Sequence, residues 1–114
     1  MNAPRESATR PWVDAFADEM EAKLAENRHK GDRAGWAEMN PAWLLARLED
    51  EVRELRAAIA YMPRCGCRSV SECYHFKRMA EPGVIRRECA DVANFAMMIA
   101  DVAGGMRPKP EDAK

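Results

Sequence analysis

The stretch that decides the fold runs from residue 88 to residue 103 and reads ECADVANFAMMIADVA. On a helical wheel it is apolar nearly all round, which predicts a central helix that packs against neighbours on more than one side. Two carboxylates interrupt it, because Glu88 and Asp91 both fall among apolar side chains on that wheel. Acidic side chains are seldom placed in apolar surroundings without a partner. This pair is therefore the first candidate for a functional site.

Two more amphipathic stretches precede it. Pro11, Pro41 and Pro82 each open an apolar-periodic run, and proline suits the first turn of a helix because its missing N–H costs nothing there. We expect three main helices over 11–28, 41–61 and 82–104, joined by linkers over 31–39 and 62–81. Alternating strand patterns are lacking. The fold class is all-α, a helical bundle of three main helices per chain that oligomerisation completes.

The chain of 114 residues has the size of one small domain. We expect a flexible N-terminus over 1–10, an all-α domain over 11–106 with an inserted cysteine-rich loop over 62–81, and a tail over 107–114. No run approaches the roughly 20 apolar residues of a membrane span. No secretory signal is visible, so the four cysteines indicate reducing cytoplasm. The net charge of −1 argues against a dedicated nucleic-acid binder.

Two carboxylate pairs share one spacing on successive helices: Glu51-x-x-Glu54 and Glu88-x-x-Asp91. Residues three apart lie on one helix face, so antiparallel packing would turn the two pairs toward each other. Four ionised acids in a partly dry groove need protons, basic side chains or a metal ion as compensation. All-oxygen ligands favour Mg²⁺ or Mn²⁺, and Mg²⁺ usually shares itself with substrate phosphates. The alternative is a solvated, salt-bridged helix face.

Over residues 44–104 the chain resembles the MazG-like members of the all-α nucleoside triphosphate pyrophosphohydrolases, through Glu51-Val-Arg-Glu54-Leu and Glu88-Cys-Ala-Asp91-Val-Ala-Asn94-Phe. The resemblance implies Mg²⁺-dependent hydrolysis of a (deoxy)nucleoside triphosphate to the monophosphate and pyrophosphate, by a homodimer or homotetramer. It also implies that the four acids of the two pairs hold the metal and that Glu51 or Glu54 orients the attacking water. The longer segment between the pairs and the lack of a further basic helix depart from the family's pattern.

Candidates for substrate binding lie outside the acid pairs. Asn94 can hydrogen-bond a sugar or base, or instead pair within the bundle. The segment 27–36 offers Asn27, Lys30 and Arg33 to phosphates and Trp36 to a base. The alternative for this segment is a plain turn that places the tryptophan in the core.

The cysteine-rich loop holds the residue types of a structural zinc site: Cys65, Cys67, Cys73 and His75. Their spacing differs from the usual Cys-x2–4-Cys form, so reduced thiols beside a solvent-facing histidine are the alternative. A second functional hypothesis is a non-catalytic helical dimerisation or regulatory module, in which Zn²⁺ staples this loop.

Overall fold

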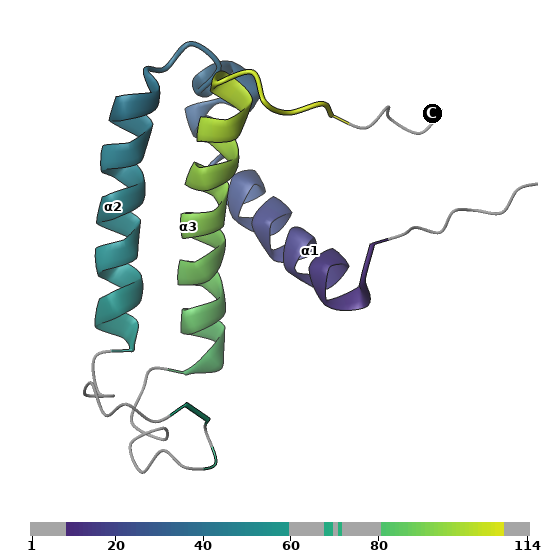
Figure 1. Cartoon of the computed structure of the whole chain (residues 1–114), viewed down its shortest axis with the longest axis vertical. Helices are drawn as coiled ribbons and strands as arrows, with labels where there is room; N and C mark the ends of the chain where they lie inside the picture. The colour runs from purple at the N-terminus through teal and green to yellow at the C-terminus, as the bar shows by residue number, and fades with distance from the viewer. Residues whose placement is uncertain (1–8, 60–67, 70, 72–80, 109–114) are drawn as a thin grey trace, which may run out of the picture.

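The computed structural model describes residues 9–59, 68, 69, 71 and 81–108. Within these residues the chain forms three α-helices and two single 3₁₀ turns, and it contains no strand. The helices are α1 (Pro11–Glu26), α2 (Pro41–Ala58) and α3 (Pro82–Val102), and the turns are η1 (Arg28–Lys30) and η2 (Arg33–Gly35). The predicted all-α fold is confirmed (Figure 1).

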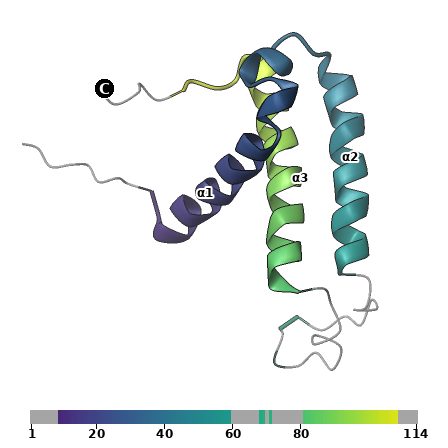
Figure 2. The same cartoon turned by 180° about the vertical axis from the view of Figure 1, so that it is seen from behind.

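The helix α3 occupies the central position. It lies beside α2 and runs antiparallel to it, while α1 crosses α3 obliquely on another side (Figures 1 and 2). The turns η1 and η2 lie at the end where α2 begins and α3 finishes. This arrangement places the two helices that carry the acid pairs next to each other, as the sequence predicts.

Local sequence explains where the helices begin and end. A proline stands in the first turn of all three, and Asn40 caps α2 because its Oδ1 accepts a hydrogen bond of 2.7 Å from the Ala42 N–H. Each helix ends two to three residues before its predicted end. At the end of α3 the reason is Gly104, whose φ of 83° turns the chain into the left-handed region that closes a helix.

The core of the described chain is small. Its fully buried apolar residues are Leu44 and Ala90, and most apolar side chains of α3 are only half-buried. An apolar pattern nearly all round the helix predicts a helix that is both central and buried; α3 is central, but most of its side chains are less buried than this pattern predicts. Trp12, Phe16, Met20 and Leu24 recur every fourth residue and so predict one apolar stripe on α1. Trp12 is nevertheless 85% exposed, because it lies at the end of α1 that diverges from α3 (Figure 1).

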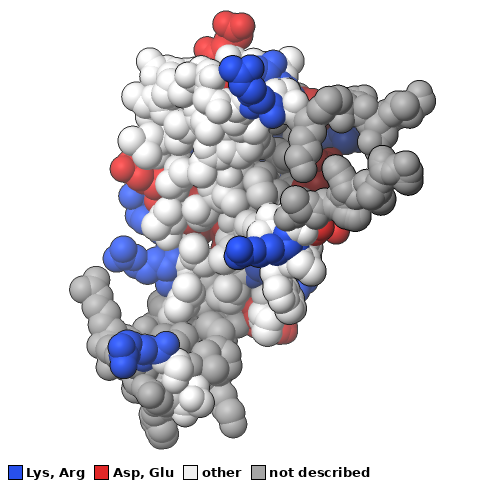
Figure 3. Space-filling model, turned by 45° about the vertical axis from the view of Figure 1, so that its right-hand side comes forward, with Lys and Arg blue, Asp and Glu red and all other residues white. Residues whose placement is uncertain are grey.

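The described surface is mixed in charge. On the face in Figure 3, lysine and arginine side chains form separate groups with acidic and uncharged residues between them, and no continuous basic stripe appears. None of the described helices combines the length and apolarity that crossing a membrane requires.

Candidate functional site

A cavity of about 490 Å³ opens between α2, α3, the last turns of α1 and the segment 27–39. This volume lies in the usual range of small-molecule sites. Charged and aromatic side chains are prominent in its lining, beside aliphatic and amide ones. They are the acids Glu51, Glu54 and Asp91, the cations Lys23, Lys30 and Arg47, and the aromatic residues Trp36, Trp43 and Phe95.

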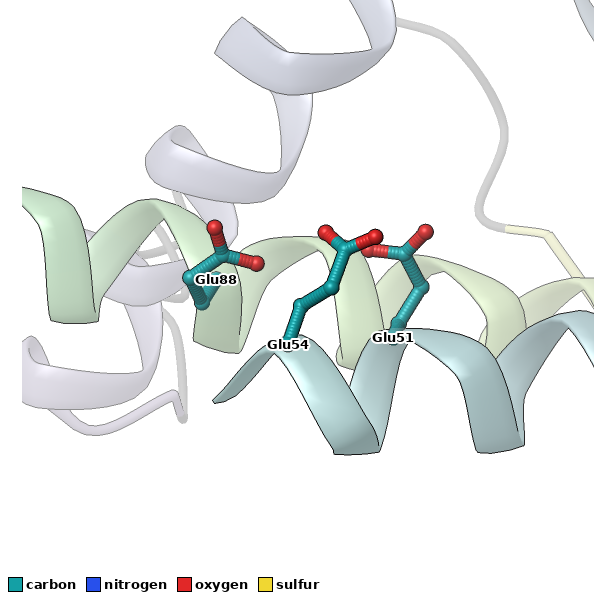
Figure 4. A group of neighbouring side chains, drawn as sticks. All are labelled: Glu51, Glu54 and Glu88. Atoms are coloured by element: carbon teal, nitrogen blue, oxygen red, sulfur yellow. The ribbon is translucent and has the colours of Figure 1, made fainter. Parts of the chain in front are cut away.

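Three glutamates come together in what we call the acid cluster: Glu51, Glu54 and Glu88. Each offers one carboxylate oxygen, and these oxygens all lie within 4.8 Å of one another. Figure 4 shows the side chains from α2 and α3 meeting above the two helices. The antiparallel packing of α2 and α3 thus brings together three of the four acids for which the sequence predicts convergence.

Burial and like charge both act on the acid cluster. Glu51 is 8% exposed, and burial raises its pKa; the nearby carboxylates, Glu54 foremost, raise it further. Arg47 opposes this shift from 4.0 Å. Burial, followed by the charges of Glu54 and Asp91, also raises the pKa of Glu88. The acid cluster therefore resists full ionisation unless a cation joins it.

The acid cluster fits a hard divalent cation. Its donors are all carboxylate oxygens, and Glu88 Oε1 is buried with no hydrogen-bond partner among the described residues. Mg²⁺ and Mn²⁺ prefer such oxygen ligands, and Mg²⁺ keeps further positions for water or phosphate oxygens. An unpartnered buried carboxylate oxygen is costly in a folded protein, and a bound ion would satisfy it.

The fourth predicted ligand, Asp91, takes a different position. It is outside the three-glutamate group, and its Oδ2 lies 3.4 Å from Lys23 Nζ on α1. Burial raises the pKa of Asp91, and Lys23 offsets part of that shift. Sequence reasoning missed Lys23, because nothing in the local pattern of α1 shows which of its residues will meet α3.

The segment 27–36 is predicted to bind substrate, and the structure divides its residues. Lys30 and Trp36 line the cavity, whereas Arg33 does not. Arg33 instead donates two hydrogen bonds to Asp101, of 2.7 and 3.0 Å, and Trp36 Nε1 donates a third of 3.0 Å. These bonds hold the pKa of Asp101 below its usual range. Asp101, which the sequence analysis missed, therefore ties this segment to α3.

Two glycines allow the segment its tight path. Gly31 has a φ of 97°, where other residues are strained, and a Cβ at Gly35 would lie 2.8 Å from the Lys30 carbonyl oxygen. Lys30 forms no ion pair with the described residues. The segment therefore presents an ammonium group at the cavity.

The two predicted asparagines both line the cavity and both bond within the chain. Asn94 is 4% exposed, and its Nδ2 donates to the Met20 carbonyl at 3.1 Å, while its Oδ1 is buried without a partner. Asn27 Nδ2 donates to the Lys23 carbonyl at 3.2 Å. The pairing of Asn94 within the bundle, one of its two predicted roles, is thus observed for the amide N–H.

The predicted zinc ligands lie outside the described residues: Cys65, Cys67, Cys73 and His75. Cys89, on α3, is a free thiol.

Comparison with protein-family models, characterised proteins and solved structures gives no match. The geometry of the cavity and the acid cluster therefore carries the functional argument.

Proposed function

We propose that the protein hydrolyses a (deoxy)nucleoside triphosphate to the monophosphate and pyrophosphate in a Mg²⁺-dependent reaction. The observation that carries the proposal is the acid cluster, two of whose members line a cavity that also holds ammonium groups and aromatic rings. A nucleotide presents the complementary parts: a phosphate chain that binds metal and cations, and a flat base.

The acid cluster would hold the metal through Glu51, Glu54 and Glu88. Bound there, Mg²⁺ supplies a Lewis acid that polarises the α-phosphate and stabilises the leaving pyrophosphate. Glu51 is the candidate general base, because it is the buried member of the acid cluster and lines the cavity that the substrate would enter. The water oxygen bonds to the α-phosphorus, the bond from that phosphorus to the bridging oxygen of pyrophosphate breaks, and Glu51 takes the proton.

Other cavity residues would bind the rest of the substrate. Lys30 would provide an ammonium for a phosphate oxygen, since it forms no ion pair within the described part of the chain. Trp36, held by its bond to Asp101, and Trp43 offer rings on which a base can stack. Arg33 has a positioning role in this proposal, because its guanidinium is occupied by Asp101.

We further infer that the chain functions as a homodimer or homotetramer. Within the described part of the chain only two apolar residues are fully buried, and several large apolar side chains there are exposed, among them Trp12 (85%), Val13 (55%) and Trp43 (51%). A second copy would cover the end of α1 and enlarge the core. Light scattering after size-exclusion chromatography should give two or four times the chain mass of 12.9 kDa, and a monomer at micromolar concentration would contradict the inference.

The test of the reaction is a substrate panel. Purified protein is incubated with each ribo- and deoxyribonucleoside triphosphate, with Mg²⁺ or with a chelator, and the products are separated by ion exchange. We expect equimolar monophosphate and pyrophosphate with Mg²⁺ only. Release of a nucleoside diphosphate and inorganic phosphate would refute the proposed reaction. Absence of turnover together with absence of a Mg²⁺-dependent thermal shift would favour the non-catalytic module.

A further inference from the structure

Lys23 occupies an unusual place between α1 and α3. Its side chain is only 14% exposed, it lines the cavity, and its Nζ lies 3.4 Å from Asp91 Oδ2. Its second acidic neighbour, Glu26 at 3.6 Å, already accepts two hydrogen bonds from Arg87 of 2.7 and 2.9 Å. Asp91 is therefore the main countercharge of a largely desolvated ammonium group.

Lys23 also acts on the acid cluster. Its positive charge lowers the pKa of Glu88 and of Asp91, in opposition to the burial that raises both. The ammonium thus adjoins two features at once, the carboxylates that would hold a cation and the space that a ligand would occupy. A polyanion entering with its metal ion would meet Lys23 at the cavity wall.

We propose that Lys23 is a phosphate-binding residue, which Asp91 holds at the cavity wall until a phosphate oxygen of a polyphosphate ligand replaces the carboxylate as its partner. The exchange keeps the ammonium paired throughout, so a desolvated charge is never left alone. The exchange would leave Asp91 free to turn toward the acid cluster. This inference deepens the proposed function and rests on it for the class of ligand.

The inference is tested with inorganic tripolyphosphate and Mg²⁺, by calorimetric titration of the full chain. Lys23→Gln keeps a hydrogen-bond donor beside Asp91 but removes the charge. The matched control is Arg86→Gln, because Arg86 forms an ion pair of 3.1 Å with Glu19 between the same two helices but does not line the cavity. Both variants thus lose one ion pair between α1 and α3.

We expect Lys23→Gln to bind Mg²⁺–tripolyphosphate about ten- to a hundredfold more weakly than the wild type, the value of one charge-assisted contact. Arg86→Gln should bind it as the wild type does, and Lys23→Arg should recover most of the loss. Mn²⁺ alone should bind Lys23→Gln at least as tightly as the wild type, because a repelling charge is gone. A purely structural role of Lys23 would not produce this opposite pair of effects.

The inference is overturned if Lys23→Gln binds tripolyphosphate with wild-type affinity, or if Arg86→Gln loses as much affinity as Lys23→Gln. It is also overturned if the wild type does not bind tripolyphosphate. If Lys23→Gln does not fold, the inference is tested in the wild type by measuring how fast a chemical reagent acetylates Lys23. Mg²⁺–tripolyphosphate should then suppress the modification at least about fivefold relative to Mg²⁺ alone, and unchanged labelling overturns the inference. If tripolyphosphate binding depends on Lys23 but no nucleotide is hydrolysed, the proposed reaction is refuted and the inference about Lys23 stands.

Discussion

The helices α2 and α1 pack against α3 by different physical means. α2 lies along α3 over most of its length, whereas α1 crosses it and is joined to it by ion pairs, Glu19–Arg86, Glu26–Arg87 and Lys23–Asp91 (Figure 2). Between α1 and α3, acidic side chains pair with basic ones. Between α2 and α3, acidic side chains face one another, and the nearest described basic side chain, Arg47, lies 4.0 Å from Glu51.

The contrast shows how one spacing can serve two purposes. Glu88 and Asp91 are three residues apart on α3, yet Glu88 faces two glutamates of α2 and Asp91 faces Lys23 of α1. Asp91 is compensated within the chain. Glu88 keeps a buried oxygen that has no hydrogen-bond partner in the described part of the chain. The acids between α2 and α3 therefore lack a compensating positive charge, and this is where we expect a metal ion to bind.

The largest effect is expected from Glu51→Gln, which removes a ligand and the candidate base together. Turnover of the preferred triphosphate should fall by about 10²–10⁴-fold, while the helical circular dichroism spectrum stays unchanged. The control is Glu49→Gln, an exposed acid of the same helix, which should keep wild-type turnover. Full activity of Glu51→Gln would remove this residue from the site.

A second comparison concerns equivalent leucines on the two packing helices. Leu44 of α2 is 1% exposed, so Leu44→Ala should lower the free energy of unfolding by about 2–5 kcal/mol. Leu24 of α1 is half-buried beside the cavity, and Leu24→Ala should cost about 1 kcal/mol. Urea unfolding measures both. Equal losses would mean that α1 contributes as much to the core as α2.

The stability of the metal-free protein should depend on pH. The pKa values of Glu51, Glu88 and Asp91 are raised in the folded chain. The folded state therefore holds more protons than the unfolded state above pH 4.5, and stability falls as pH rises through the raised pKa values. The lowered pKa of Asp101 acts in the opposite direction, but its contribution is complete above the ordinary aspartate range.

We therefore expect the melting temperature to decrease from pH 5 to pH 8 and the decrease to be smaller in Glu88→Gln. Mg²⁺ at about 100 times its Kd should restore about 2.7 kcal/mol at pH 8. Differential scanning calorimetry measures both quantities. A melting temperature that rises over this range in the wild type would contradict the assigned burial of the acids.

The smallest effect is expected for an exposed ion pair of the α1 side. Arg87→Gln removes the two hydrogen bonds to Glu26, whose side chain is 44% exposed. Such pairs contribute about 0–1 kcal/mol and weaken in salt. Urea unfolding at low and high ionic strength should show a small loss that disappears with salt. A large loss that salt does not change would mean that this pair is essential for docking α1.

Rules that act within a single helix were enough to predict most of the fold and the acid cluster. Pro11, Pro41 and Pro82 mark the helix starts, and the i, i+3 spacing places each acid pair on one face. Antiparallel packing of consecutive helices then brings Glu51, Glu54 and Glu88 together. None of these predictions depends on knowing the angle between α1 and α3.

What the sequence could not predict depends on that angle and on the path of the segment 27–39. The Lys23–Asp91 pair joins residues on α1 and α3, and the Arg33–Asp101 pair joins residues 68 positions apart. Arg33 was predicted as a phosphate ligand because an arginine in a loop looks available. Its occupied guanidinium becomes visible only when α3 brings Asp101 beside it. Trp12 is exposed for a similar reason. Apolar residues at every fourth position predict which face of a helix packs, but not where along the helix the contact with its neighbour ends.

The divalent cation site is tested most directly by a Mn²⁺ titration without nucleotide, in which electron paramagnetic resonance measures the free ion. We expect the wild type to bind Mn²⁺ and Glu88→Gln to bind it at least about tenfold more weakly. Glu19→Gln, which alters an acid already paired with Arg86, should bind it as the wild type does. Absence of Mn²⁺ binding by the wild type, or equal affinity in Glu88→Gln, would contradict the claim that the acids between α2 and α3 form a divalent cation site.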